Sequence, residues 1–89
     1  MDYSGTWENE KTSEIIRINS VVNKSDTFLF EWEFKANVFI KQEEIQILII
    51  DNSISHFSAQ NSSGLIHNLN ENSILINGEK FIKHETYNY

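Results

Sequence analysis

The chain has 89 residues, no cysteine and no proline, and 13 acidic residues against 7 basic ones give it a formal net charge of −6. This length allows one domain with a small core, and without disulfides or thiolate metal sites, association into a homodimer is the remaining way to add buried surface. The acidic balance argues against a nucleic-acid binder, because phosphate contacts need clustered cations and Arg17 is the only arginine.

Apolar residues recur at every second position along the chain, which predicts strands and not helices. A weak strand is expected at 4–8, and a second at 14–22 with Ile16, Ile18 and Val22 facing inward. The clearest strand is 27–35. Its apolar face carries Phe28, Phe30, Trp32 and Phe34, and its other face carries Leu29, Glu31, Glu33 and Lys35. We expect the aromatic face, together with Trp7, to form the core.

The middle of the chain predicts several shorter strands. Segments 38–42, 54–59 and 65–69 are weak candidates, and 41–45 suits a short turn. Segment 44–51 places Ile45, Ile47 and Ile49 on one face. Leu48 and Ile50 make its other face apolar as well, so we expect this strand to be central or covered at one end.

Turns are expected where Asn, Ser, Asp and Gly cluster, at 23–26, 51–53, 61–64, 70–72 and 77–78. The most specific of these is Asn77-Gly78, because both residues accept the positive φ values of a two-residue hairpin turn. Ile74 should then face Phe81 across the hairpin. In total we expect eight or nine short strands in one all-β domain spanning 1–89, with no helix longer than two turns.

Gly5-Thr6-Trp7 and the closing hairpin at 74–83 resemble small bacterial lipocalin-like (calycin-type) β-barrel proteins, which open with Gly-x-Trp and often end in an Asn-Gly hairpin. The resemblance implies a single antiparallel up-and-down barrel, or a barrel-like sandwich, in which Trp7 plugs one end. The chain is much shorter than true lipocalins, and only Lys80 and Lys83 are available where many of them place an arginine over this tryptophan. Because eight short strands enclose little more than their own side chains, we expect a barrel that is largely filled and has no ligand cavity of useful size.

Catalytic and metal-binding patterns are weak. His56, His67 and His84 fall on separate strands without ligand spacing, so no metal site is expected. The serines lack a nucleophile frame, and no glycine-rich loop could hold a phosphate. Glu31 and Glu33 project from one face about 7 Å apart, but alternating glutamates commonly keep a strand soluble. We therefore expect neither catalysis nor a cofactor.

Two functional hypotheses remain. The leading one is a small acidic inhibitor or adaptor that docks a basic protein through an exposed strand edge or an acidic face, as an anti-defence protein of a phage or mobile element would. Its motivation is the acidity and the segment 42–79, which contains no Lys or Arg. The residues expected to bind the partner are Glu8, Glu10, Glu31, Glu33, Lys35, Glu43 and Glu44.

The alternative hypothesis is a carrier of a small apolar ligand, as the lipocalin resemblance implies. An internal void lined by Trp32 and phenylalanines would favour the carrier, whereas a filled barrel would favour the protein binder. The first residues carry no signal-peptide pattern and the longest apolar run, 47–50, is far too short to span a bilayer. We accordingly expect a cytoplasmic protein that does not bind membranes.

Overall fold

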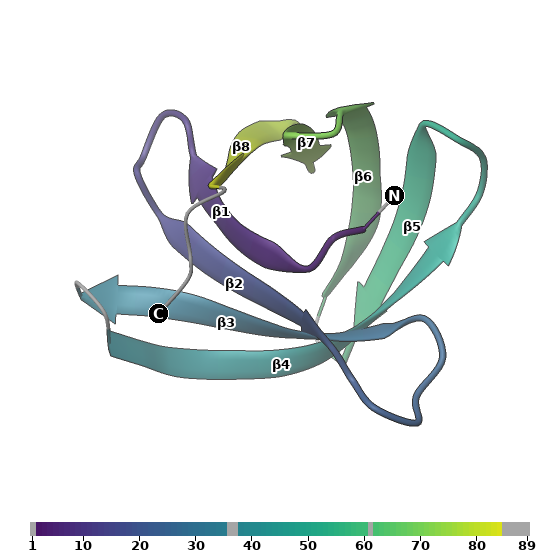
Figure 1. Cartoon of the computed structure of the whole chain (residues 1–89), viewed down its shortest axis with the longest axis horizontal. Helices are drawn as coiled ribbons and strands as arrows, with labels where there is room; N and C mark the ends of the chain where they lie inside the picture. Colours follow the sequence, from purple (N-terminus) through teal and green to yellow (C-terminus); the bar gives the residue numbers. More distant parts are fainter. Residues whose placement is uncertain (1, 36–37, 61, 85–89) are drawn as a thin grey trace.

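The computed structural model describes residues 2–35, 38–60 and 62–84, and these residues form eight strands and no helix. The strands form one closed barrel (Figure 1). Their bounds are β1 Gly5–Asn9, β2 Ile15–Ser20, β3 Thr27–Lys35, β4 Val38–Ile49, β5 Ile54–Ala59, β6 Ser62–Asn70, β7 Ser73–Ile76 and β8 Glu79–His84.

Every strand is antiparallel to the strands beside it, and spatial order follows chain order. The barrel closes where β8 pairs with β1, with Trp7 opposite Lys83 and Asn9 opposite Phe81. Closure matters for a small domain because it pairs most of the strand edges at which separate chains would otherwise associate. The expected all-β, up-and-down antiparallel barrel is therefore confirmed.

The period-two pattern decides which side chains fill the barrel. On β3, Phe30 is 4 % exposed, and Phe28 and Trp32 are half-buried against the core. Trp7 is fully buried, as expected. The side chain of Phe34 lies outside the described residues. The buried apolar core consists of Tyr3, Trp7, Ile16, Ile18, Phe30, Ile45, Ile47, Phe57, Ile66, Ile74 and Phe81.

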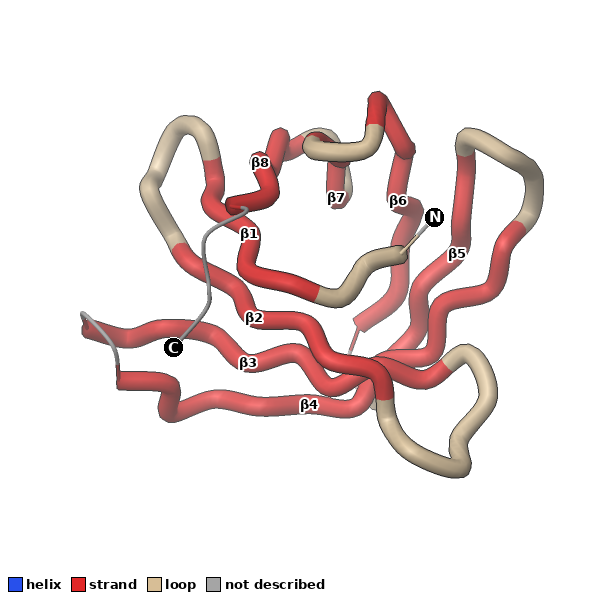
Figure 2. Tube along the Cα trace, in the orientation of Figure 1, coloured by secondary structure: helices blue, strands red, loops and turns tan. Residues whose placement is uncertain are grey.

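The turns join strands that are neighbours in the chain, as the loops of Figure 2 show. Asn77 and Gly78 have φ values of 50° and 86°, and Ile74 lies opposite Phe81, so the expected hairpin is confirmed. In the β4–β5 turn, Asp51 Oδ1 accepts hydrogen bonds from the backbone N–H groups of Ser53 and Ile54. Hydrogen bonds to a side-chain oxygen thus stabilise a turn in a chain that contains no proline.

Four expectations about the strands are wrong. Segments 38–42 and 44–51 are not two strands separated by a turn, because β4 is continuous from Val38 to Ile49. Val22 is 83 % exposed, since β2 ends at Ser20 before the inward position is reached. The second apolar face of 44–51 is not covered, because Leu48 is 43 % and Ile50 60 % exposed. The turn expected at 61–64 is also shorter, because β6 already begins at Ser62.

The hairpin of β3 and β4 extends beyond the strands on either side of it. The β2–β3 pairing ends with Ile16 opposite Trp32, and the β4–β5 pairing begins only with Gln46 opposite Ser58. In Figure 1 these two strands run together along the bottom of the view. Because, among the described residues, β2 and β5 do not pair with this part of the β3–β4 hairpin, the barrel is more open at this end.

Candidate functional site

An apolar cavity of about 200 Å³ occupies the more open end of the barrel. Its wall consists of inward-facing side chains from β2 to β8, because alternate residues of every strand point to the interior. These are Ile16, Phe30, Trp32, Ile45, Phe57, Ile66, Ile76 and Phe81. The barrel is therefore largely filled by its core, but it keeps a cavity that was not expected for eight short strands.

Polar residues surround the mouth of this cavity. They are Glu14, Ser62, Asn77 and Glu79, all of them exposed and all close to strand ends or turns. An apolar wall with a few polar groups at its entrance is the usual composition of a small-molecule site. This arrangement can take up an apolar group and leave a polar one in water.

The opposite end of the barrel is closed by Tyr3 and Trp7. The Trp7 indole N–H donates to the Tyr3 carbonyl at 2.9 Å, and the Tyr3 hydroxyl lies 2.9 Å from Ser55 Oγ and donates to Asn68 Oδ1 at 2.8 Å. Every buried polar side-chain atom of the described residues has a hydrogen-bond partner. Polar groups that are satisfied in this way stabilise a rigid closed end.

Lys83 of β8 lies over the closed end. Its Nζ is 5.5 Å from the centre of the Trp7 ring, a cation–π distance, and it also donates to the backbone carbonyl of Asp2 at 3.3 Å. Lys83 is thus the basic residue that covers the tryptophan, whereas Lys80 lies 3.9 Å from Glu10.

A larger hollow of about 780 Å³ lies outside this closed end. Apart from Leu69, the residues around it are polar or charged, and it is more open to solvent than the apolar cavity, so it desolvates a ligand less. The Ser4 backbone N–H donates to Asp2 Oδ1 at 2.9 Å, and this bond lowers the pKa of Asp2 below its ordinary value of 3.8. We regard the smaller apolar cavity as the better candidate site.

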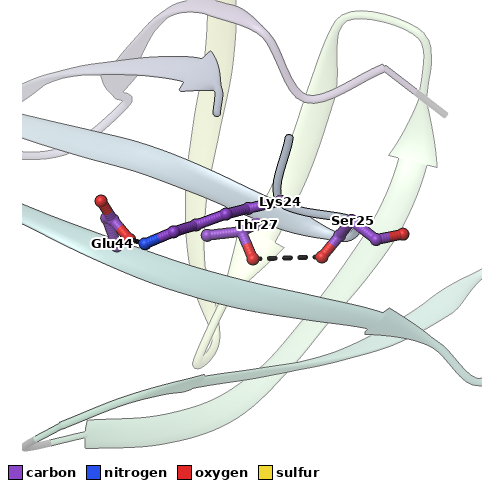
Figure 3. Close-up of polar contacts among 4 residues, drawn as sticks. All are labelled: Lys24, Ser25, Thr27 and Glu44. Carbon is purple, nitrogen blue, oxygen red and sulfur yellow. Dashed lines mark hydrogen bonds and ion pairs between the residues drawn. The ribbon is translucent and has the colours of Figure 1, made fainter. Parts of the chain in front are cut away.

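The acidic residues expected to bind a partner do not form one free negative face. Three of them lie within 4.0 Å of a lysine or arginine nitrogen, which reduces the field they project, and a fourth lies within this distance of an imidazole nitrogen. The pairs are Glu31 with Arg17 at 3.6 Å, Glu44 with Lys24 at 2.7 Å (Figure 3), Glu10 with Lys80 at 3.9 Å and Glu8 with His84 at 2.7 Å.

Glu43 is on the wrong side of the sheet for an outer acidic face. It lies directly opposite Phe30, whose side chain is inside the barrel, and directly opposed residues project to the same face. Glu44 therefore faces outward and Glu43 inward. Glu33 follows Glu31 on β3 at a point where bulges interrupt the pairing with β4, and the side chain of Lys35 lies outside the described residues.

The histidines are distributed over three strands, His56 on β5, His67 on β6 and His84 on β8. Within residues 2–35, 38–60 and 62–84, no three His, Asp or Glu side chains come together as a metal ion would need. No helix in this part of the chain is long and apolar enough to cross a membrane.

The sequence predicts that the aromatic strand 27–35 contributes to the core, but it does not predict a cavity. Phe57, Ile66 and Ile76, which line the cavity, and Glu14 and Glu79 at its mouth are not singled out by the sequence. Alternation alone could have placed Phe57 and Ile66 inward. Whether inward residues meet or leave a space depends on how the strands are staggered, which alternation does not specify.

The chain matches no protein-family model, no curated protein and no solved structure. Its own geometry therefore defines its class, a closed eight-stranded up-and-down β-barrel with one end sealed around a tryptophan and an apolar cavity at the other.

Proposed function

We propose that this protein binds a small apolar molecule in the cavity of its barrel and acts as a carrier, in the manner of lipocalin-like proteins. The observation that supports this most directly is the cavity of about 200 Å³ lined by Trp32 and by Phe30, Phe57 and Phe81. An apolar cavity of roughly 150 Å³ is enough to hold benzene. A ligand of one or two aromatic rings, or a short acyl chain, suits this volume.

The construction of the two ends supports the same proposal. Tyr3, Trp7 and Lys83 close one end through hydrogen bonds and a cation–π contact, so a ligand enters from the end that carries Glu14 and Glu79. Burial of its apolar surface provides the affinity, at about 25 cal/mol per Å² before the cost of immobilising the ligand. The polar mouth leaves any polar substituent in water.

The test is a titration with toluene and naphthalene, followed by tryptophan fluorescence and by thermal unfolding. Trp32 lines the cavity and should report binding, while Trp7 is fully buried elsewhere. A ligand that binds only the folded state raises the unfolding temperature, and the rise grows with the ratio of free ligand concentration to Kd. We expect toluene and naphthalene to raise the unfolding temperature, and aromatic compounds too large for the cavity to leave it unchanged.

A matched pair of variants on β7 makes this test specific. Ile76→Phe should fill part of the cavity and weaken toluene binding at least about tenfold, because the ligand and the new ring compete for one space. Leu75→Phe adds the same ring to the neighbouring residue, which does not line the cavity and should leave binding unchanged. Equal loss in both variants, or no binding to the unmodified protein, would contradict the proposal.

Docking of a basic protein is the second candidate function. It is supported by the net charge of −6 and by Glu31 and Glu33 on the outside of β3. The ion pairs of Glu31 and Glu44, however, already place cations on the same surface. We therefore rank an acidic inhibitor or adaptor below the carrier. The docking function would be favoured if a native partner bound less tightly at higher salt concentration. The double variant Glu31→Lys with Glu33→Lys should then also weaken that binding.

A further inference from the structure

The edge of β4 from Lys41 to Ile45 has a strand neighbour on one side only, within the part of the chain that the structure describes. It pairs with β3, from Trp32 opposite Lys41 to Phe28 opposite Ile45. On its other side, pairing with β5 begins at Gln46. An unpaired edge exposes backbone N–H and C=O groups that can pair with another extended strand.

The charges along this edge are arranged about Gln42. Lys41 and Glu43 are opposite in sign and share one face of β4, because side chains two residues apart point the same way. Lys41 Nζ lies 4.8 Å from the centre of the Trp32 ring, and Glu43 forms no ion pair among the described residues. Charged residues on a strand edge usually oppose pairing with another strand. Whether Lys41 and Glu43 oppose or favour pairing therefore depends on which residues of the second strand lie opposite them.

A second copy of the chain can pair antiparallel with this edge through a two-fold axis perpendicular to the sheet. Such an axis places one residue opposite its own copy, and the residues before and after it opposite each other. Centred on Gln42, the axis puts Lys41 of each copy opposite Glu43 of the other. The strand is thus complementary to itself in charge, and two opposite-charge pairs form at once.

The same charges exclude the alternative registers on this edge. An axis at Lys41, Glu43 or Glu44 places identical charges directly opposite each other, which destabilises a strand pair. An axis at Ile45 requires pairing to Gln46, whose edge is already occupied by Ser58 of β5. Gln42 is therefore the one centre within Lys41–Ile45 that is compatible with both charge and space.

We propose that two copies of this protein associate through the edge of β4, antiparallel and centred on Gln42, with Lys41 of each copy paired to Glu43 of the other. Lys41, Gln42 and Glu43 do not line the cavity, so the proposal does not rest on ligand binding, although Lys41 contacts the Trp32 ring. The edge is short, and the contact buries less than the roughly 1,200 Å² of a stable specific interface. The dimer is accordingly weak and concentration-dependent.

Sedimentation velocity over protein concentrations from about 10 µM to about 1 mM tests this association. The unmodified protein should shift from monomer to dimer in this range. Lys41→Glu and Glu43→Lys should each weaken dimerisation at least about tenfold, because each places like charges opposite one another. The double variant Lys41→Glu with Glu43→Lys restores both pairs with reversed signs and should recover the dimer.

Lys11→Glu is the matched control. It changes the net charge as Lys41→Glu does, but Lys11 is exposed in the turn between β1 and β2 and should leave dimerisation unchanged. Circular dichroism of each variant establishes that the barrel has folded. A protein that stays monomeric at about 1 mM, a dimer insensitive to both single changes, or a double variant that remains monomeric would each overturn the proposal.

Discussion

Phe30 and Trp32 are successive inward residues of β3, yet they contribute differently to the molecule. Phe30 is 4 % exposed and belongs to the buried core, whereas Trp32 is half-buried and lies at the cavity. From the sequence, Trp32→Ala would be expected to cost about 3 to 5 kcal/mol. Both residues line the cavity, but only Trp32 is also partly exposed to solvent, so the larger cost is expected for Phe30.

We therefore predict that Phe30→Ala lowers the free energy of unfolding by about 3 to 5 kcal/mol and that Trp32→Ala lowers it by less. Urea titrations of both variants, followed by circular dichroism, give the two values on one scale. Equal losses of unfolding free energy in the two variants would show that Trp32 packs as tightly as the core. Such a result would contradict a cavity beside Trp32.

At the scale of the element, the β7–β8 hairpin depends on left-handed backbone at its turn. Gly78 has a φ of 86°, where a side chain is strained although a Cβ there would meet no atom within 4 Å. Gly78→Ala should therefore destabilise the protein by about 1 kcal/mol through the backbone alone. Ser25→Ala, in the β2–β3 turn, is the control in a thermal unfolding series. An unchanged unfolding temperature for Gly78→Ala would mean that the turn has another conformation.

The β4–β5 turn gives a prediction about pH. Hydrogen bonds from the backbone N–H and the side chain of Ser53 lower the pKa of Asp51 below 3.8. A lowered pKa means that the ionised form stabilises the fold above the ordinary pKa, and that this contribution disappears as pH falls through the lowered value. Asp51→Ala should thus reduce the unfolding temperature most near neutral pH. The difference from the unmodified protein should shrink at acid pH, and a constant difference would contradict this cause.

The whole molecule is a ring of strands in which each one depends on both neighbours. Its closing pair, β1 with β8, joins the two ends of the chain through contacts such as Asn9 opposite Phe81. Because opening this seam would expose Trp7 and Phe81 together, we expect one cooperative transition and no separate loss of β8. Single-tryptophan variants Trp7→Phe and Trp32→Phe should therefore give the same urea midpoint by fluorescence as by far-ultraviolet circular dichroism. Fluorescence and circular dichroism midpoints that differ within one variant would indicate that the seam opens first.

Local features of this barrel follow directly from the sequence, because they depend on residues a few positions apart. Side chains in a strand alternate between faces, so the pattern of Phe28, Phe30 and Trp32 identified β3 and its inward side. The backbone preferences of Asn77 and Gly78 likewise determined the last hairpin and the pairing of Ile74 with Phe81.

Only the tertiary structure decided the features that depend on how distant strands are staggered. The cavity exists because the inward side chains of seven strands, from β2 to β8, do not meet at one end of the barrel. The position of Glu43 on the inner face follows from the continuous β4, where a turn had been expected to separate two strands. The ion pair of Lys24 with Glu44 joins residues 20 positions apart and reduces a negative charge that composition alone would count in full.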